Sequence, residues 1–172
     1  MIFVPGRGNA RHCPWEKPRL KFRLPYRPRS AKLLPVSRSK SITFPCNVAA
    51  GRAAGLALRQ FLAEQGFSDD VLFACELSLA EACNNAVHHA TPDQRQQSVT
   101  AEARLNDGWI ELTVIDHTNG FDWPGTIPPP DPNINAGRGL YLIQSMMDEV
   151  SYTRSASGNR MQMRKRMVDR ER

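Results

Sequence analysis

The spacing of hydrophobic positions predicts two consecutive helices in the middle of the chain. Across residues 48–65 apolar residues recur at helical intervals, Asn47 stands where an N-cap belongs, and Gly66 follows where a glycine commonly ends a helix. Ser68 can cap a second helix over residues 69–90, whose first turn is acidic and which stops before a proline.

Alternation of polar and apolar residues predicts five short strands. The alternating runs are residues 41–44, 99–105, 109–115, 150–153 and 159–167. The folded part of the chain is predicted to begin near Ser39. Asn106-Asp107-Gly108 separates the second and third runs and is a strong tight-turn signal, and Ser157-Gly158 lies between the last two runs. Each of these two pairs of runs is therefore predicted to form a hairpin.

A long loop and a third helix separate the two hairpins. Residues 121–136 contain five prolines, which restrict this lid-like loop, and it is too long to be a simple connector. After it, Gly137-Arg138-Gly139 opens a helical pattern with its apolar residues on one side. The order of elements predicts an α+β fold, a two-layer sandwich with helices on one face of a mixed, mostly antiparallel sheet.

Charge divides the chain into unequal parts. Residues 1–40 hold eleven Lys and Arg and one acid, a net charge of +10, whereas residues 41–172 hold twelve Lys and Arg and sixteen acids, a net charge of −4. A basic, proline-rich segment cannot bury enough apolar surface to offset its ordering entropy. We therefore predict a disordered tail over residues 1–38, one folded domain over residues 39–168 and a short C-terminal tail over residues 169–172.

The basic tail leaves two interpretations open. Its charge could bring it to nucleic acid or to an acidic partner surface. The alternative is an unstructured extension, and no helix-turn-helix or aromatic RNA-binding motif accompanies the basic residues.

Composition indicates a protein of the cytoplasm. No run approaches the ~18 to 20 apolar residues that a membrane helix requires, and the N-terminus lacks the ordered regions of a secretory signal. The four cysteines have neither CxxC spacing nor a histidine pattern suited to zinc. They are expected to be reduced thiols, with Cys75 and Cys83 buried in the second helix as small hydrophobes.

Three polar residues of the second predicted helix share one face. Glu81, Asn85 and His89 stack at successive i,i+4 positions, while the opposite side of the helix is apolar. A carboxylate one helical turn from an amide oxygen is an arrangement that suits a metal site with a general base beside it. Mg²⁺ prefers oxygen ligands and usually keeps waters and substrate phosphates among them. From spacing alone, a solvated polar face would give the same pattern. His88 is expected to point away from the cleft that His89 faces, since adjacent helical residues lie about 100° apart.

Two further segments place polar or glycine residues at the ends of predicted elements. Asp116 ends an apolar strand and Gly120 follows it, where an acid can accept a hydrogen bond from the amino group of a base and a glycine lets backbone approach a ligand. An ordinary Asx turn is the alternative. Gly137 and Gly139 open a helix, whose free N–H groups and dipole favour a phosphate.

Together the three segments resemble the motifs of the GHKL, or Bergerat-fold, ATPase superfamily. The string Glu81-Ala-x-x-Asn85-Ala-x-x-His89-Ala resembles its asparagine box, Asp116-x-Thr118-x-Gly120-Phe-Asp its first glycine box, and Gly137-Arg-Gly139-Leu-Tyr-Leu-Ile its second. The stretch Met147-Asp-Glu-Val150 is similar to the matching stretch of the serine/threonine-protein kinases that act as anti-sigma factors. The resemblance covers about residues 40–167.

The resemblance implies roles for the residues of the asparagine box. Glu81 would be the general base that takes the proton from a serine hydroxyl of a partner protein, Asn85 would ligate Mg²⁺, and His89 would face the nucleotide cleft. These residue types suit phosphoryl transfer, in which positioning and electrostatic stabilisation dominate.

The resemblance also implies roles for the two glycine boxes. Asp116 would accept a hydrogen bond from the adenine amino group, and Gly120 would lie against the nucleotide. Gly137 and Gly139 would flank the phosphates, and Arg138 would supply positive charge at the γ-phosphate.

The function implied is that of an ATP-dependent protein-serine kinase acting as an anti-sigma factor. Such a protein phosphorylates a small anti-sigma-factor antagonist, sequesters a sigma factor and, by family resemblance, forms a homodimer. A histidine-kinase fragment is a poorer interpretation, because no phosphoacceptor-histidine helix pair precedes the domain.

Two positions depart from the family pattern. Thr118 replaces the first glycine of the first glycine box, where a β-branched residue restricts the turn. Asn135 stands where several family kinases place an arginine. These departures leave a second hypothesis open, a catalytically weak or inactive binding module that regulates only by sequestering its partner.

Overall fold

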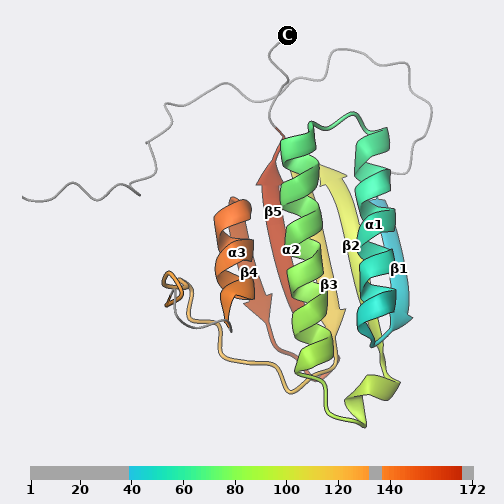
Figure 1. The fold of residues 1–172 in the computed structure, drawn as a ribbon, viewed down its shortest axis with the longest axis vertical. Helices are drawn as coiled ribbons and strands as arrows, with labels where there is room; N and C mark the ends of the chain where they lie inside the picture. Colours follow the sequence, from blue (N-terminus) through green and yellow to red (C-terminus); the bar gives the residue numbers. More distant parts are fainter. Residues whose placement is uncertain (1–38, 132–136, 168–172) are drawn as a thin grey trace, which may run out of the picture.

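The computed structural model describes residues 39–131 and 137–167, which fold into two layers (Figure 1). One layer is a single five-stranded sheet in the order β1-β2-β3-β5-β4, and every neighbouring pair is antiparallel. The strands are β1 (Ser39–Pro45), β2 (Ser98–Asn106), β3 (Trp109–Asp116), β4 (Glu149–Thr153) and β5 (Asn159–Arg166). The predicted, mostly antiparallel sheet is thus confirmed, and no two described strands pair in parallel.

The second layer consists of helices on one face of the sheet. These are α1 (Val48–Glu64), α2 (Asp69–His88) and α3 (Arg138–Met146). The helix α2 crosses the middle of the sheet, with α1 on the β1 side and α3 on the β4 side (Figure 1). The two-layer α+β sandwich is therefore confirmed. A short 3₁₀ helix, η1 (Gln94–Gln96), precedes β2 and was not predicted.

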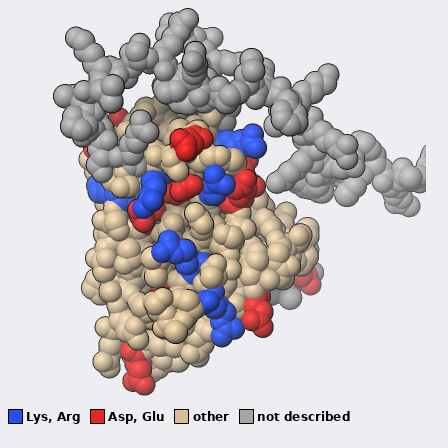
Figure 2. Space-filling view, turned by 180° about the vertical axis from the view of Figure 1, so that it is seen from behind, with Lys and Arg blue, Asp and Glu red and all other residues tan. Residues whose placement is uncertain are grey.

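The other face of the sheet carries side chains of both charges, and no described helix covers it (Figure 2). On this face Arg164 packs 4.2 Å from the centre of the Trp109 ring and pairs with Glu111 and Glu149. Outward residues such as these alternate with more buried residues along β2, β3 and β5, which is the kind of pattern that predicted the strands.

The helix ends follow the sequence signals with two corrections. The Asn47 side chain caps α1 as predicted, accepting a hydrogen bond from the backbone of Ala50 at 2.9 Å. Ser68 occupies the N-cap position of α2 but makes no side-chain capping bond. The helix also ends at His88 rather than near residue 90, with His89 as its C-cap, whose backbone N–H donates to the Asn85 carbonyl.

The hydrophobic core lies between the helices and the sheet. Its fully buried side chains come from both layers and include Leu58, Leu62, Leu79, Ile110, Leu112 and Val114. Cys75 and Cys83 lie in this core as free thiols, as predicted. Burial raises the pKa of each of these two thiols to about 12. Both cysteines therefore act as apolar packing groups.

Strand pairing decides which residues meet at the end of the sheet. The β2–β3 hairpin turns through Asp107 and Gly108, both at positive φ, which confirms the predicted tight turn. In the next pair, Asp116 of β3 lies opposite Asn159 of β5. This register brings together two residues that are far apart in the sequence.

Several predictions concern residues that the structure does not describe. These are the tails at residues 1–38 and 169–172, and Asn135 in the long loop. Within the described ranges, no helix is long and apolar enough to cross a membrane.

Candidate functional site

A cavity of about 950 Å³ opens between α2, the end of β3, the loop that follows it and the start of α3. This volume lies at the upper end of the ~300–1,000 Å³ typical of small-molecule sites. The structure brings all eight predicted site residues to its walls: Glu81, Asn85, His89, Asp116, Gly120, Gly137, Arg138 and Gly139. Three segments distant in sequence thus form one site.

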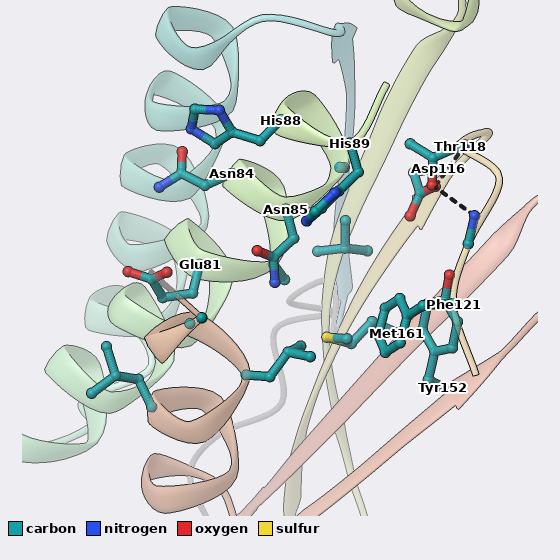
Figure 3. A pocket seen from close by; sticks show the side chains of 18 of the residues that line it. Glu81, Asn84, Asn85, His88, His89, Asp116, Thr118, Phe121, Tyr152 and Met161 are labelled. Atoms are coloured by element: carbon teal, nitrogen blue, oxygen red, sulfur yellow. Dashed lines mark hydrogen bonds between the residues drawn. The ribbon is translucent and has the colours of Figure 1, made fainter. Parts of the chain in front are cut away.

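The polar face of α2 forms one wall of this cavity. Figure 3 shows Glu81 at the opposite end of the cavity from Asp116, with Asn85 between them and His89 nearest to Asp116. His88 points in a different direction from His89, as adjacent helical residues must. It nevertheless lines the rim of the cavity, so the prediction that His88 lies away from the cleft was wrong.

The first turn of α3 packs directly against this wall. Gly137 is the N-cap in left-handed conformation, with φ of 76°. A β-carbon at Gly139 would lie 2.7 Å from Glu81 Oε2 and 3.5 Å from Asn85 Oδ1. Because glycine has no β-carbon, the helix start can approach both side chains closely.

Asp116 is buried at the end of β3, where it accepts several hydrogen bonds on one oxygen. Its Oδ1 accepts from the Thr118 backbone amide at 2.8 Å, the Thr118 hydroxyl at 2.7 Å and Asn159 Nδ2 at 3.0 Å. The predicted alternative, an Asx turn, is therefore present, and it positions an acid that also lines the cavity.

Thr118, the departure from the family pattern, fits this turn without backbone strain. Asp107 is the single non-glycine residue at positive φ among the described residues, so Thr118 does not occupy a conformation that favours glycine. Its hydroxyl donates to Asp116 and accepts from the Gly120 backbone amide at 3.2 Å. The threonine thus stabilises the turn that it was expected to restrict.

Gly120 is required by a close contact with the neighbouring strands. It has φ of 66°, and a β-carbon there would lie 2.8 Å from the Tyr152 hydroxyl and 2.9 Å from Asn159 Oδ1. Tyr152 in turn stacks on Phe121, with ring centroids 4.2 Å apart (Figure 3). Burial, and then the negative charge of Asp116, raise the pKa of the Tyr152 hydroxyl.

Several lining residues were missed by sequence reasoning. They supply much of the apolar wall and part of the rim: Val114, Phe121, Leu140, Leu142, Tyr152, Met161, Asn84 and Asn119. The alternation along β5 could have placed Met161 on the inner face of the sheet, yet its position beside Val114 depends on the β3–β5 register. Asn159, buried beside Asp116, was missed for the same reason.

The Gln144 side chain of α3 attaches the described part of the proline-rich loop to this helix. Gln144 Oε1 accepts from the backbone amide of Ile127 at 2.8 Å, and Gln144 Nε2 donates to the Gly125 carbonyl at 3.0 Å. The described part of this loop therefore has a fixed attachment to the helix whose first turn lines the cavity.

The oxygen donors at the Glu81 end of the cavity fit a shared magnesium ion. No group of three or more His, Cys, Asp and Glu in the described ranges could hold a metal by itself. The side-chain oxygens of Glu81 and Asn85 nevertheless converge on the same point of α3. Mg²⁺ is usually bound by one or two protein oxygens together with substrate phosphates, so Asn85, the predicted ligand, suits an ion shared with a nucleotide beside the Glu81 carboxylate.

Fold and site together define a nucleotide-binding domain of the histidine kinase-like ATPase class. Residues 44–165 match the histidine kinase-like ATPase domain family. The chain therefore belongs to this family, in its serine-protein kinase branch. Binding of ATP follows from the family, and the sequence-based assignment is confirmed.

The relatives in that branch share one name. The chain is 30% identical over 119 residues to serine-protein kinase RsbW of Bacillus velezensis, an alignment that covers 64% of this chain and 74% of the relative. It is 29% identical over 104 residues to serine-protein kinase RsbW of Bacillus subtilis, covering 55% of this chain and 65% of the relative.

Two solved structures share the fold. The RsbU and RsbW domains of Rv1364c from Mycobacterium tuberculosis align with a TM-score of 0.57 and 22% identity, covering 74% of this chain and 32% of that one. The SiaB–SiaC complex from Pseudomonas aeruginosa aligns with a TM-score of 0.52 and 14% identity, covering 75% of this chain and 91% of that one. At these identities the likeness concerns the fold alone.

Proposed function

We propose that this chain is an ATP-dependent protein-serine kinase that acts as an anti-sigma factor, phosphorylating a small antagonist protein and sequestering a sigma factor. The observation that carries the proposal is the convergence of Glu81 and Asn85 on the first turn of α3. This arrangement would place a base and a metal ligand beside the N–H groups that bind phosphate.

The nucleotide is proposed to lie along the cavity from Asp116 to Glu81. The adenine amino group donates to Asp116, and the base lies against the apolar wall near Gly120. The phosphates lie between Gly137 and Gly139, where the N-terminus of α3 and its helix dipole favour negative charge. Arg138, which also lines the cavity, supplies positive charge at the γ-phosphate.

Phosphoryl transfer needs few protein groups in this geometry. The serine oxygen of the partner attacks the γ-phosphorus, its proton passes to the Glu81 carboxylate, and the bond to the bridging oxygen breaks, so that its electron pair leaves with ADP. Mg²⁺ held by Asn85 and the phosphates would neutralise charge on the phosphate oxygens. His89 lines the middle of the cleft and borders the nucleotide.

Transfer from radiolabelled ATP to a candidate antagonist tests this proposal. Glu81→Gln keeps the side-chain shape but removes the base, so transfer is expected to fall by roughly 10²–10⁴-fold. Glu76→Gln is the matched control, because Glu76 lies on the same helix and pairs with Arg59 at 2.7 Å outside the cavity. Undiminished transfer by the Glu81→Gln protein would exclude the role given to Glu81.

The alternative module, which acts by sequestration alone, differs in nucleotide binding. Calorimetry with ATP and Mg²⁺ separates the two, since a kinase must bind ATP at millimolar concentration or below. The hydrogen-bonded Thr118 turn supports the kinase, because it removes the geometric objection to nucleotide binding.

The partner proteins are proposed from the branch to which the chain belongs. Phosphorylation adds about two negative charges to a serine, which can release one partner and free the kinase to bind the other. Mixing the chain with a candidate sigma factor and antagonist, with and without ATP, should exchange the complexes on gel filtration. A complex whose composition ATP does not change would contradict partner switching.

The organisation of the chain is also proposed. The ATP-binding unit comprises residues 39–168, acts in the cytoplasm as a homodimer, and is flanked by segments 1–38 and 169–172.

Removing residues 1–38 should leave ATP affinity unchanged, and analytical ultracentrifugation should report twice the mass of one chain. A gel-shift assay of the full chain and the shortened chain tests whether the basic segment contacts nucleic acid.

A further inference from the structure

We infer that Asn159 and Thr118 are positioning residues that occupy one oxygen of Asp116 and thereby make the site select adenine over guanine. This inference rests on the proposed function, because it concerns the base of the nucleotide that Asp116 would recognise. Asn159 itself lies behind the cavity wall and would act through Asp116.

Asn159 is held in place by the fold. It is 4% exposed, begins β5 and lies opposite Asp116 in the β3–β5 register. Its Nδ2 donates to Asp116 Oδ1 at 3.0 Å and to the Thr118 carbonyl at 2.8 Å, with Thr118 Oγ1 at 3.3 Å. Both hydrogens of the amide are therefore used within this cluster.

The neighbours of Asn159 fix the orientation of its amide. A carboxylate oxygen and a backbone carbonyl are both acceptors, so the NH₂ group must face them and the amide oxygen must face Gly120. An aspartate of the same shape would place oxygen against these two acceptors. The residue at position 159 must therefore be a hydrogen-bond donor as well as having the right size.

The consequence for Asp116 is an asymmetric carboxylate. Its Oδ1 accepts from three donors, two from Thr118 and one from Asn159. Its Oδ2 accepts no hydrogen bond from the described residues, and Asp116 lines the cavity. The described residues therefore leave one oxygen of Asp116 open to a base in the cavity.

One free acceptor suits adenine and does not suit guanine. Adenine offers its exocyclic amino group, which needs one acceptor. Guanine pairs with a carboxylate through two adjacent N–H donors, which need both oxygens, and its O6 would be repelled by the acid. Because a buried polar group without its partner costs about 1–3 kcal/mol, guanine should be rejected.

The test is the ratio of ATP to GTP affinity, measured by calorimetry with Mg²⁺ on the full chain. The unchanged protein is expected to prefer ATP by about 10²-fold or more. Asn159→Ala and Thr118→Val each remove a donor to Oδ1 and should lower this preference by about tenfold. Thr118→Ser keeps the hydroxyl but loses the methyl group, and it should retain the preference for ATP. This result would show that the hydroxyl, and not the packing of the side chain, sets the preference.

Thr113→Val provides a control for general loosening. Thr113 is a buried polar residue of β3, the strand that ends with Asp116, and it does not line the cavity. Its replacement should lower stability but leave the ratio of ATP to GTP affinity unchanged. If Asn159→Ala does not fold, the Thr118→Val and Thr118→Ser pair carries the test.

The outcomes separate this inference from the proposed function. If the unchanged chain binds neither nucleotide, the proposed function fails. If it binds ATP and the ratio is the same in Thr118→Val, Thr118→Ser and any folded Asn159→Ala protein, the kinase proposal stands and the inference is overturned.

Discussion

Gly139 at the start of α3 lies so close to Glu81 that a β-carbon on the glycine would be 2.7 Å from Glu81 Oε2. The two residues belong to different sequence motifs, and the packing of α3 against α2 brings them together. The backbone that would hold phosphate is therefore in contact with the side chain that would take the proton. This contact makes the geometry of the site sensitive to a single methyl group.

Gly139→Ala should reduce phosphotransfer by about 100-fold, because a displacement of about 1 Å at a reacting group can cost that much. The stability of the fold should change little, since Glu81 can swing aside and alanine favours helix by ~1 kcal/mol over glycine.

Gly55→Ala is the matched control for this substitution, because a β-carbon at this helical glycine of α1 meets no atom within 4 Å. The control should keep full activity. Normal transfer by the Gly139→Ala protein would show that the contact with Glu81 is unimportant.

Gly120→Ala should destabilise the fold by about 2 kcal/mol or more, because it adds a strained left-handed conformation to contacts with Tyr152 and Asn159. The stacking of Tyr152 on Phe121 limits the room for adjustment. Gly125→Ala shares the positive φ but meets no atom within 4 Å, so it should cost only ~1 kcal/mol. Urea unfolding measures the unfolding free energy of both variants. An equal loss of stability in the two would mean that backbone strain alone matters.

The proline-rich loop is expected to slow the exit of ATP while it is attached to α3. Gln144→Ala removes two hydrogen bonds of this attachment, each worth about 1 kcal/mol, and should therefore speed the release of ATP by roughly tenfold. Stopped-flow displacement of a fluorescent ATP analogue measures this rate. Ser145→Ala, one residue along the same helix, removes only a bond to the Tyr141 carbonyl and should leave the rate unchanged. Identical release rates for the two variants would argue against the loop as a barrier to nucleotide exit.

Alkaline pH should destabilise the chain through its two core cysteines. Burial raises the pKa of Cys75 and Cys83 from 9.0 to about 12, so the folded state holds their protons more tightly than the unfolded state does. Their contribution to stability is fully present below pH 9.0 and is lost as pH rises towards 12, by roughly 1.4 kcal/mol per pH unit for each thiol.

The double variant Cys75→Ala and Cys83→Ala isolates this effect. Its unfolding free energy should fall less steeply above pH 9.0 than that of the unchanged protein, with parallel curves at neutral pH. Urea unfolding at a series of pH values makes the comparison. Parallel curves up to pH 11 would contradict the assignment of the alkaline loss to these thiols.

Local sequence signals predicted the secondary structure closely. The helical spacing and Asn47 gave the start of α1, and the alternating runs on either side of residues 106–108 gave the β2–β3 hairpin. Such features depend on neighbouring residues, so a short window of sequence contains them. The exceptions are the unpredicted 3₁₀ helix η1 and two details of helix ends, Ser68 and the end of α2, where local preferences are weakest.

From the sequence alone, helical periodicity aligned Glu81 with Asn85, and the resemblance of three motifs to those of the GHKL ATPases predicted the eight residues that line one cavity. Only the tertiary structure decided what those residues touch. Asn159 meets Asp116 through the order of the strands, and Gly139 meets Glu81 through helix packing. These contacts join residues more than forty positions apart, and their geometry depends on the whole sheet and its helices. Thr118 looked like a defect in the sequence, yet its hydroxyl bonds locally to Asp116, and its carbonyl accepts from Asn159 only because the β3–β5 pairing brings that amide beside it.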